Sequence, residues 1–277
     1  MSLVNKELYD NADCQRKAVQ INWEISECIR QAGESVDAAF PLIPYLLYKV
    51  SLYNNPFGIT LQAILDGEIE VENDVRYLLK ACLNDKLWDC LLQLVNKYST
   101  EDFALAVVAP VTDNESKGTM PTPNSILKLA HKILNVKAGE NVADVCCGSG
   151  TYIVSAALEE ANAIYHGYEI NVESRAAAMM KAELLDSDIE ISLCDAFTVA
   201  ESEKMPKYDK IFANYPFGLK LKNLGAGTVY LEKLAEKYPS LSKATSSDWV
   251  FNALICDMLT DCGKAIGIMT NGSTWNS

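Results

Sequence analysis

The chain has 277 residues, of which 49% are hydrophobic, and its formal net charge is −13. This composition supports one large or two smaller folded domains and excludes a disordered chain. No apolar run approaches the about 18–20 residues of a membrane helix. The acidic balance argues against a protein that grips nucleic acid with a basic face of its own.

The nine cysteines are scattered along the chain, and none forms a C-x-x-C pair. An odd number of such cysteines is typical of reduced thiols in the cytoplasm, and the first residues show no basic, apolar secretory signal. The two histidines, His131 and His166, lie outside any Cys/His cluster of the kind that binds zinc. We therefore expect a cytoplasmic protein with no membrane segment and no metal.

Helical periodicity dominates the first part of the chain. Residues 13–33 carry apolar side chains near a 3.6-residue period and stop at Gly33. The predicted core face of this helix consists of Val19, Trp23, Ile25 and Ile29. Further helices are predicted over 37–55, where prolines interrupt the pattern, and over 71–99, as one helix or a pair. Residues 1–105 are therefore predicted to form an all-helical domain.

Beyond residue 140, short apolar runs alternate with helical segments. Strands are predicted at 141–147, 163–170, 189–195, 208–216 and 264–271. Helices are predicted at 124–134, 151–162, 173–187 and 248–263. Strand–helix alternation with apolar strands indicates a parallel sheet covered by helices on both faces. The expected fold class is α/β, with a Rossmann-like sheet in a domain over 106–277 that ends early, after its fifth strand.

The first predicted strand runs into the sequence DVCCGSG at 144–150. In doubly wound sheets, ligands bind beyond the carboxyl ends of the strands. Gly148 and Gly150 let the backbone turn tightly and approach a ligand, and the following helix offers free N–H groups. A plain strand-to-helix turn has the same letters, so the loop alone leaves both interpretations open.

Two acidic residues end the next two predicted strands. Glu169 follows Gly150 by 19 residues, a spacing that suits a carboxylate accepting from ribose hydroxyls. Asp195 can accept from an adenine amino group while the ring of Phe197 packs on the base. For each acid, a solvated side chain at a strand end is the alternative.

The glycine loop lacks the last glycine of a dinucleotide-binding loop. The G-x-G-x-x-G pattern that starts at Gly148 requires a glycine at position 153, where the chain has Ile153. A pyrophosphate ligand is therefore disfavoured. A nucleoside without phosphates, such as S-adenosylmethionine, fits the loop and the two acids better.

The sequence NYPFG at 214–218 follows the fourth predicted strand. Methyl transfer to an exocyclic amine requires the nitrogen lone pair to face the sulfonium donor. The carboxamide oxygen of Asn214 and the backbone carbonyl of Tyr215 can accept the two amine hydrogens. Pro216 favours an extended backbone at Tyr215, and Phe217 offers a face to a flipped base.

A near-copy of this motif, NNPFG, stands at 54–58. It follows a helical run, and no strand precedes it. Asn-Asn-Pro after a helix is a stop-and-turn signal. The context therefore predicts a turn at 54–58 and a working site at 214–218.

With these motifs in place, the chain resembles the modification subunits of type I restriction-modification systems, which are adenine-N6 DNA methyltransferases. The family's Asp-Pro-Ala-Cys-Gly-Thr-Gly stands here as DVCCGSG, and its Asn-Pro-Pro-Phe-Gly stands as NYPFG. Its Phe-Tyr-Thr-Pro is matched loosely by MPTP at 120–123, and DWVFNALICDML resembles its next helix. The resemblance covers about residues 117–277.

The resemblance implies a reaction, a cofactor and roles for matching positions. The implied S-adenosylmethionine site consists of Thr122, Asp144, Gly148, Ser149, Gly150, Glu169, Asp195 and Phe197. The implied adenine site consists of Asn214, Tyr215, Pro216 and Phe217. DNA is the implied substrate, a separate specificity subunit chooses the sequence, and a restriction subunit is a further partner. Such a partner would allow an acidic subunit to act on DNA.

The chain departs from the family at two motifs. Tyr215 replaces the first proline of the catalytic motif, and Met120-Pro121 replace an aromatic pair. We expect activity to be retained, because Asn214 keeps its amide and Tyr215 keeps a carbonyl. Two alternatives remain open: an N-methyltransferase acting on protein glutamine or another amide or amine, which the acidic charge favours, and an inactive subunit that binds S-adenosylmethionine or a partner.

Overall fold

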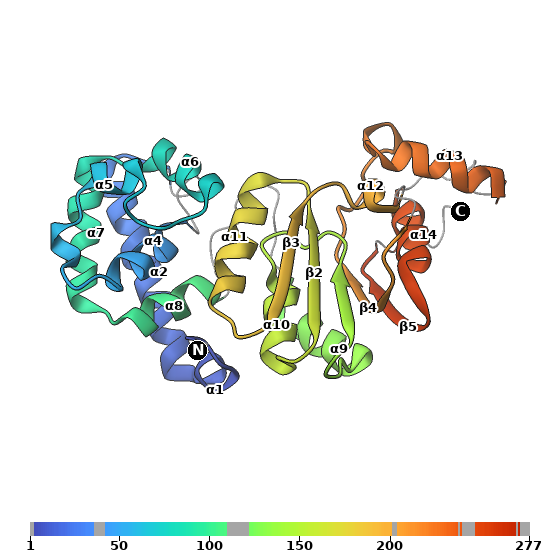
Figure 1. The fold of residues 1–277 in the computed structure, drawn as a ribbon, viewed down its shortest axis with the longest axis horizontal. Helices are drawn as coiled ribbons and strands as arrows, with labels where there is room; N and C mark the ends of the chain where they lie inside the picture. Colours follow the sequence, from blue (N-terminus) through green and yellow to red (C-terminus); the bar gives the residue numbers. More distant parts are fainter. Residues whose placement is uncertain are drawn as a thin grey trace. The chain divides into compact units, whose positions relative to one another are not determined.

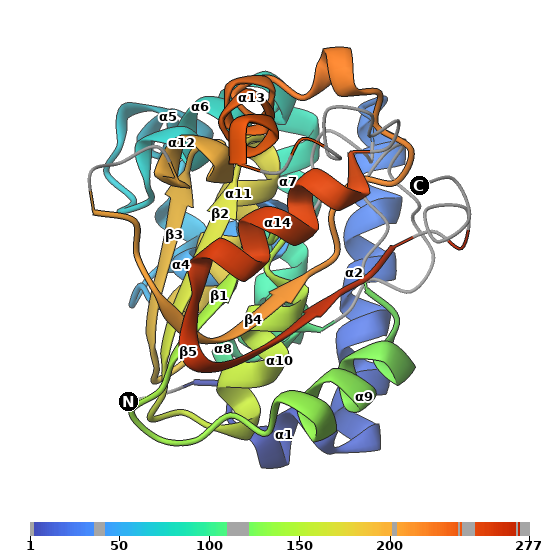
Figure 2. The ribbon, with the colours of Figure 1, turned by 90° about the vertical axis from the view of Figure 1, so that its right-hand side faces the viewer.

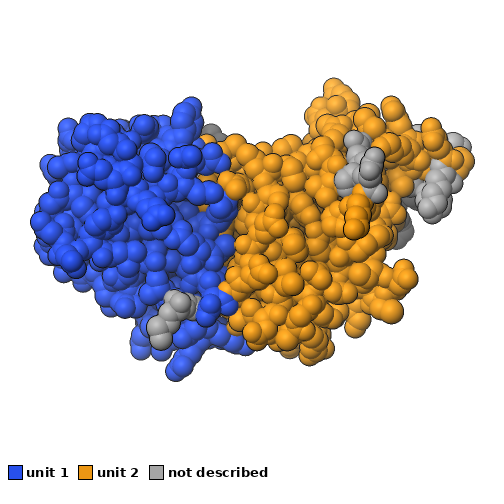
Figure 3. All heavy atoms as spheres, viewed as in Figure 1, with its two compact units in different colours: residues 1–121, 179–186 blue, residues 122–178, 187–277 orange. Residues whose placement is uncertain are grey.

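The computed structural model describes residues 3–35, 42–109, 122–200, 204–237, 239, 247–269 and 271. The chain divides into two compact units, which Figure 3 shows in two colours. Unit 1 consists of Met1–Pro121 and Met179–Asp186, and unit 2 consists of Thr122–Ala178 and Ser187–Ser277. The division after Pro121 falls later than the predicted boundary at residue 105.

Within the described residues of unit 1, every element that begins and ends before residue 122 is a helix (Figure 1). Its elements are α1 (Lys6–Asp10), α2 (Ala12–Ala32), α4 (Leu42–Ser51), the 3-10 helix η1 (Pro56–Gly58), α5 (Leu61–Asp66), α6 (Asn73–Cys82), α7 (Asp85–Lys97) and α8 (Thr100–Val108). The predicted helix stop at Gly33 is confirmed, because Gly33 takes a left-handed φ of 85° and caps α2. The stretch 71–99 forms a pair of helices, α6 and α7.

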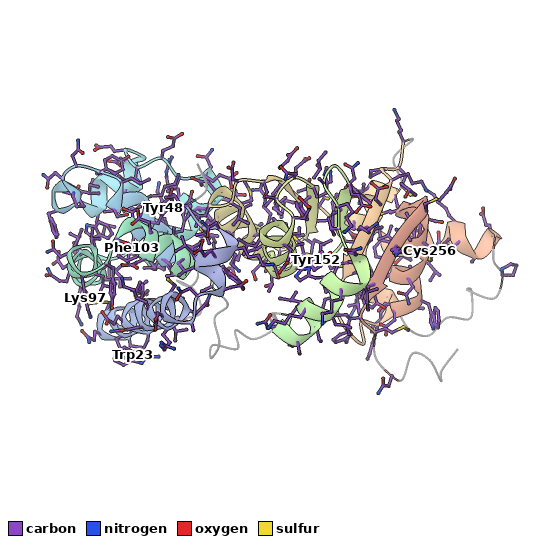
Figure 4. The ribbon with its side chains drawn as sticks, turned by 90° about the horizontal axis from the view of Figure 1, so that it is seen from below. Trp23, Tyr48, Lys97, Phe103, Tyr152 and Cys256 are labelled. Carbon is purple, nitrogen blue, oxygen red and sulfur yellow. A yellow bond between two sulfur atoms is a disulfide. The ribbon has the colours of Figure 1, made fainter. Side chains whose placement is uncertain are left out.

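The core of unit 1 is built on α4 and α8, which pack against each other. Both helices also contact α2, and α4 contacts α7 as well. One predicted face is partly wrong. Ile25 and Ile29 of α2 are fully buried, whereas Trp23 is 61% exposed and lies at the periphery of its unit in Figure 4. The buried face instead passes through Ile21 and the polar residue Asn22, whose Nδ2 donates to the carbonyl of Ala106. A buried polar residue with its own partner is hidden from a hydrophobicity pattern.

The prediction that all cysteines are reduced thiols is also wrong. Cys28 of α2 and Cys90 of α7 form a disulfide. The two helices pack side by side, and this brings together cysteines separated by 62 positions in sequence. The other seven cysteines are free thiols.

Unit 2 holds a five-stranded sheet with the strand order β3-β2-β1-β4-β5 (Figure 2), in which all paired strands are parallel. The strands are β1 (Asn141–Asp144), β2 (Ile164–Glu169), β3 (Asp188–Leu193), β4 (Tyr208–Ala213) and β5 (Leu259–Gly267). The helices are α9 (Asn124–Leu134), α10 (Thr151–Glu159), α11 (Val172–Glu183), whose residues from Met179 onward belong to unit 1, α12 (Ala196–Ala200), the 3-10 helix η2 (Leu221–Asn223), α13 (Gly227–Lys237) and α14 (Asp248–Met258). The predicted parallel α/β sheet is confirmed.

Helices cover both faces of the sheet. On β4, Ile211 and Ala213 belong to the core cluster that also contains residues of α12, α13 and α14. The intervening residue Phe212 faces the other way and stacks on Tyr152 of α10. Helix α9 lies against α10, β4 and β5. This alternation buries both faces, which explains why the strands read as apolar runs.

The last predicted helix ends earlier than expected. α14 stops at Met258, and β5 begins at the next residue, Leu259, so Thr260–Gly263 belong to the strand. The pairing of β4 with β5 shifts register between Tyr208 and Lys210. This irregularity accommodates the extra residues of β5 beside β4.

Within the described part of the chain, no helix combines the length and the apolar character that crossing a membrane requires.

Candidate active site

Three polar side chains stand at the carboxyl ends of adjacent strands. Asp144 is the last residue of β1 and Glu169 the last of β2, while Asn214 directly follows β4. Because β1 lies between β2 and β4, parallel strands bring these three positions to one edge of the sheet. Asp144 is in register with Gly167 and with Phe212, so Glu169 and Asn214 each extend two residues beyond it.

The glycine loop between β1 and α10 uses two left-handed residues. Gly148 has a φ of 55° and Gly150 a φ of 76°. A Cβ on Gly150 would lie 3.0 Å from the Cβ of Ala178, so the glycine lets α11 pack closely against the loop. A Cβ on Gly148 would meet nothing within 4 Å. Open space at Gly148 is what a backbone that receives a ligand requires.

Glu169 holds this loop in place. Its Oε2 accepts from the backbone N–H of Gly148 at 2.8 Å, and its Oε1 accepts from the N–H of Asn171 at 2.7 Å. Each oxygen has a further lone pair for a ligand hydroxyl. The next residue, Ile170, is 71% exposed. Its apolar side chain can cover a flat base beside the acid, and the exposed isoleucine after Glu169 is a signal that the sequence reasoning missed.

Asp144 is nearly inaccessible. It is 2% exposed, and its Oδ1 accepts from the N–H of Cys146 at 3.1 Å. Burial is the main cause that raises the pKa of Asp144 to about 7; the bond from Cys146 opposes this shift, and the nearby charge of Glu169 adds to it. Burial, with Asp144 and Glu169 nearby, also raises the pKa of the Cys146 and Cys147 thiols. These thiols are therefore protonated and unreactive at neutral pH.

Asp195 and Phe197 occupy different environments. The Oδ1 atom of Asp195 accepts from the N–H of Phe197 at 3.0 Å, and Gly225 of the loop after η2 lies close to Oδ2. Phe197 is only 2% exposed, and its ring packs against Tyr230 and Phe251 inside the core. In this structure Phe197 offers no face to an adenine, because α12 turns its ring away from the strand ends into the cluster beneath α14.

The NYPFG segment separates into buried and exposed parts. Asn214 is partly buried, and its Nδ2 donates to Oγ1 of Thr122 at 3.2 Å, which leaves Oδ1 as an acceptor. Tyr215 is 1% exposed, whereas Pro216 is exposed and Phe217 is 52% exposed. Met120 and Pro121, which replace the family's aromatic pair just before Thr122, lie outside the described residues. Thr122 and Asn214, 92 positions apart in sequence, are thus brought together as both motifs require.

The near-copy at 54–58 has a different setting. Its Pro56–Gly58 part forms the 3-10 turn η1 in unit 1, and the element directly before it is the helix α4. The prediction of a turn at this position is confirmed.

An aromatic stack joins the elements that carry the site. Tyr152, at the second position of α10, stacks on Phe212 of β4 at 4.1 Å and on His131 of α9 at 5.7 Å between ring centroids. Figure 4 labels Tyr152. Phe212 stands two residues before Asn214, and Tyr152 stands two residues after Gly150. The stack therefore sets the spacing between the glycine loop and the NYPFG segment, a role that the sequence did not indicate.

The family profile described as N-6 DNA Methylase matches residues 101–277, well over half of the chain. The chain belongs to the N-6 DNA methylase family. Such an enzyme transfers a methyl group from S-adenosylmethionine to the N6 amino group of adenine in DNA. None of the curated proteins matches the chain in sequence.

Two of the solved structures that resemble this N-6 DNA methylase align with almost its whole length. The first is assigned as a modification subunit of a putative type I restriction enzyme from Vibrio vulnificus YJ016. It aligns with a TM-score of 0.59 and 14% sequence identity, and the alignment covers 93% of this chain and 72% of the Vibrio chain. The second is assigned as a putative class I S-adenosylmethionine-dependent methyltransferase from Listeria monocytogenes. It aligns with a TM-score of 0.56 and 13% sequence identity, and the alignment covers 95% of this chain and 76% of the Listeria chain. At these identities the likeness shows the fold, and it confirms the predicted methyltransferase sheet.

The donor set at the strand ends fits S-adenosylmethionine. Glu169 ends β2 and Asp195 follows the end of β3 by two residues, and the segment 144–151 contains no lysine or arginine. Carboxylates without a basic partner suit a cationic sulfonium and ammonium ligand and oppose a phosphate. The open space at Gly148 and the free lone pairs of Glu169 add room and acceptors for its ribose.

Proposed function

We propose that this N-6 DNA methylase is the modification subunit of a type I restriction-modification system, and that the NYPFG segment is its adenine site. One observation carries the proposal. Asn214 directly follows β4, the strand that pairs with β1, and its amide nitrogen donates to Thr122. Asn214 therefore comes from the strand end adjacent to the one that leads into the Gly148 loop, which supports a role for its carboxamide oxygen close to the methyl donor.

Each residue of the segment has a distinct task in this proposal. Oδ1 of Asn214 and the carbonyl of Tyr215 accept the two N6 hydrogens, which directs the nitrogen lone pair outward. The exposed ring of Phe217 stacks on the extruded base. When bound, S-adenosylmethionine supplies the methyl group, which moves to N6 as its bond to sulfur breaks. The amine then loses a proton to water, so no strong base is required.

The cofactor is held by the neighbouring strand ends. Glu169 accepts from the ribose hydroxyls, while Ile170 and Asp195 border the adenine of the cofactor. Gly148, Ser149 and Gly150 bring the backbone close to it, and Thr122 orients both Asn214 and the methionine end. Asp144 shapes the loop through its bond to Cys146.

The net charge of −13 calls for a partner that binds the DNA. In this proposal a separate specificity subunit grips the duplex and selects the sequence, and a restriction subunit is a further component. The Vibrio vulnificus protein that shares the fold is assigned to such a system. The site of action is then the cytoplasm, where the DNA and both partners are found.

The test is transfer of a tritiated methyl group to adenine-containing DNA in the presence of the specificity subunit. We expect Asn214→Ala to lower kcat by about 100-fold or more, because one of the two lone-pair-directing acceptors is lost. The near-copy provides a matched control, since Asn54→Ala removes the same side chain from the same letters and should leave the rate unchanged. Equal incorporation by wild type and Asn214→Ala would refute the assignment.

A further inference from the structure

The side chain of Tyr215 is anchored in the core although its backbone belongs to the exposed NYPFG segment. Its ring stacks on Phe251 of α14 with 4.8 Å between centroids and 5° between planes. Its hydroxyl donates to Oδ1 of Asn252, the next residue of α14, at 3.2 Å. With 1% of its surface exposed, Tyr215 is among the most buried aromatic residues of unit 2.

The receiving site for this hydroxyl is itself fixed. Asn252 also donates through Nδ2 to the sulfur of Met269, just after β5. Gly267 makes room for it, because a Cβ there would lie 2.9 Å from Oδ1 of Asn252 and 3.5 Å from Cε1 of Tyr215. Gly267 is the register partner of Ala213, the last residue of β4. The anchor thus joins α14 and the end of β5 to the residue that follows Asn214.

The anchor acts on the one backbone carbonyl whose direction matters for the reaction. Pro216 restricts the conformation of Tyr215 towards extended values, chiefly through ψ. Nothing equivalent fixes φ at a tyrosine, whereas a proline at this position would have φ set by its ring. A ring held between Phe251 and Asn252 fixes the Cα–Cβ direction of Tyr215 and therefore limits φ from the side chain.

We propose that Tyr215 is a positioning residue, whose ring and hydroxyl, held by Phe251 and Asn252, aim its backbone carbonyl at the target amine. This inference rests on the proposed function of the NYPFG segment and adds a mechanism to it. The tyrosine replaces the rigidity of a proline with a side-chain tether to α14. Asn252 and Gly267 become parts of the tether rather than ordinary packing residues.

The test combines kinetics with hydrogen exchange in three variants. Tyr215→Phe keeps the stack and loses the hydrogen bond, Asn252→Ala removes the same bond from the other side, and the double variant removes both partners. We expect each single variant to lower kcat about 5- to 10-fold, and the double variant to lower it no further, because the two groups act as a unit. Affinity for S-adenosylmethionine and KM for DNA should stay within about twofold of wild type.

Amide exchange within 208–220, followed by mass spectrometry, gives a readout that needs no turnover. Faster exchange of this peptide in Tyr215→Phe and Asn252→Ala is expected. Tyr165→Phe is the matched control, since its hydroxyl also bonds in a buried setting, to the carbonyls of Ala156 and Glu160. It should change neither kcat nor exchange of the segment.

The outcomes separate the two proposals. Loss of activity in Asn214→Ala together with wild-type kcat and exchange in Tyr215→Phe and Asn252→Ala would overturn the tether and leave the proposed function standing. An inactive wild type that binds S-adenosylmethionine would count against the proposed function. In that case the exchange rates alone would still decide whether the hydroxyl holds the segment.

Discussion

At the scale of single residues, Gly148 and Gly139 allow backbone strain to be separated from ligand contact. Both have left-handed φ angles, 55° and 78°, and a Cβ on either would meet nothing within 4 Å. Alanine at either site should lower the free energy of unfolding by a similar amount, about 1–2 kcal/mol. Only Gly148 belongs to the cofactor loop, so Gly148→Ala alone should raise the Kd for S-adenosylmethionine, by about tenfold. Calorimetry with both variants checks this, and equal Kd values would remove Gly148 from the site.

Asp144 makes stability depend on pH. Its pKa is raised by burial to about 7 in the folded chain, against about 3.9 when unfolded. Between these values the folded state holds a proton that the unfolded state has lost, so stability falls as pH rises from about 4 to about 7 and is level above that. Three pKa units correspond to about 4 kcal/mol at most. Asp144→Asn removes this term and keeps an acceptor for Cys146.

We therefore expect the stability of Asp144→Asn to rise relative to cofactor-free wild type as pH increases from about 4 to about 7, with a constant difference above. Urea unfolding of both proteins across this range measures the difference. A constant difference at every pH would mean that the carboxyl titrates equally in the folded and unfolded chains.

The sequence predicted which residues lie at the strand ends that form the site, but it did not predict the directions of their side chains. Glu169 and Asn214 stand where parallel strands must end, so strand pattern alone placed them at one edge. The ring of Phe197 was expected against a base and Tyr215 was expected to act through its backbone carbonyl, and the structure buries both rings against Phe251. The direction of such a ring depends on its tertiary contacts, and no periodicity encodes that direction for a residue in a loop or a very short helix.

At the scale of elements, the hydroxyl of Tyr152 lowers the free energy of unfolding, although its ring belongs to the stack that joins α9, α10 and β4. Among the described residues it is buried without a hydrogen-bond partner. Tyr152→Phe keeps both ring contacts and removes this cost, so we expect it to raise the free energy of unfolding by about 1 kcal/mol.

Tyr165→Phe offers the opposite case, because the single hydrogen of the Tyr165 hydroxyl has two carbonyl acceptors within reach. It should destabilise by about 1 kcal/mol. Urea denaturation of the two variants gives both values with the same chemical change. Destabilisation of equal size in both would show that Tyr152 has a partner, such as a buried water.

Elements with a complete local signal were predicted well, and those fixed by distant contacts were not. Gly33 ended α2 as expected, and the alternation beyond residue 140 gave all five strands. The start of β5 at Leu259 was missed because Thr260–Gly263 gain their strand structure from pairing with β4. The Cys28–Cys90 bond depends in the same way on helix packing, which sequence spacing does not contain.

At the scale of the whole molecule, the negative net charge of the chain opposes binding of DNA, whose phosphates are also negative. Each phosphate contact by a basic side chain gains affinity through counterion release, and a chain of net charge −13 has few such contacts to offer. The proposed division of labour follows: one subunit supplies chemistry and another supplies the grip on DNA. Alone, the chain should therefore bind a cognate duplex more weakly than about 10⁻⁴ M at physiological salt.

With the specificity subunit, the same duplex should bind with a Kd of about 10⁻⁸ M and show a steep loss of affinity with salt. Fluorescence anisotropy of a labelled duplex, titrated with the chain, with the specificity subunit and with both, measures the two contributions. Asn214→Ala should assemble and bind as wild type does, because its side chain serves the base rather than the backbone of the duplex. Tight, salt-sensitive binding by the chain alone would contradict the division of labour, since an acidic surface cannot release counterions from DNA without a basic patch that overrides its net charge.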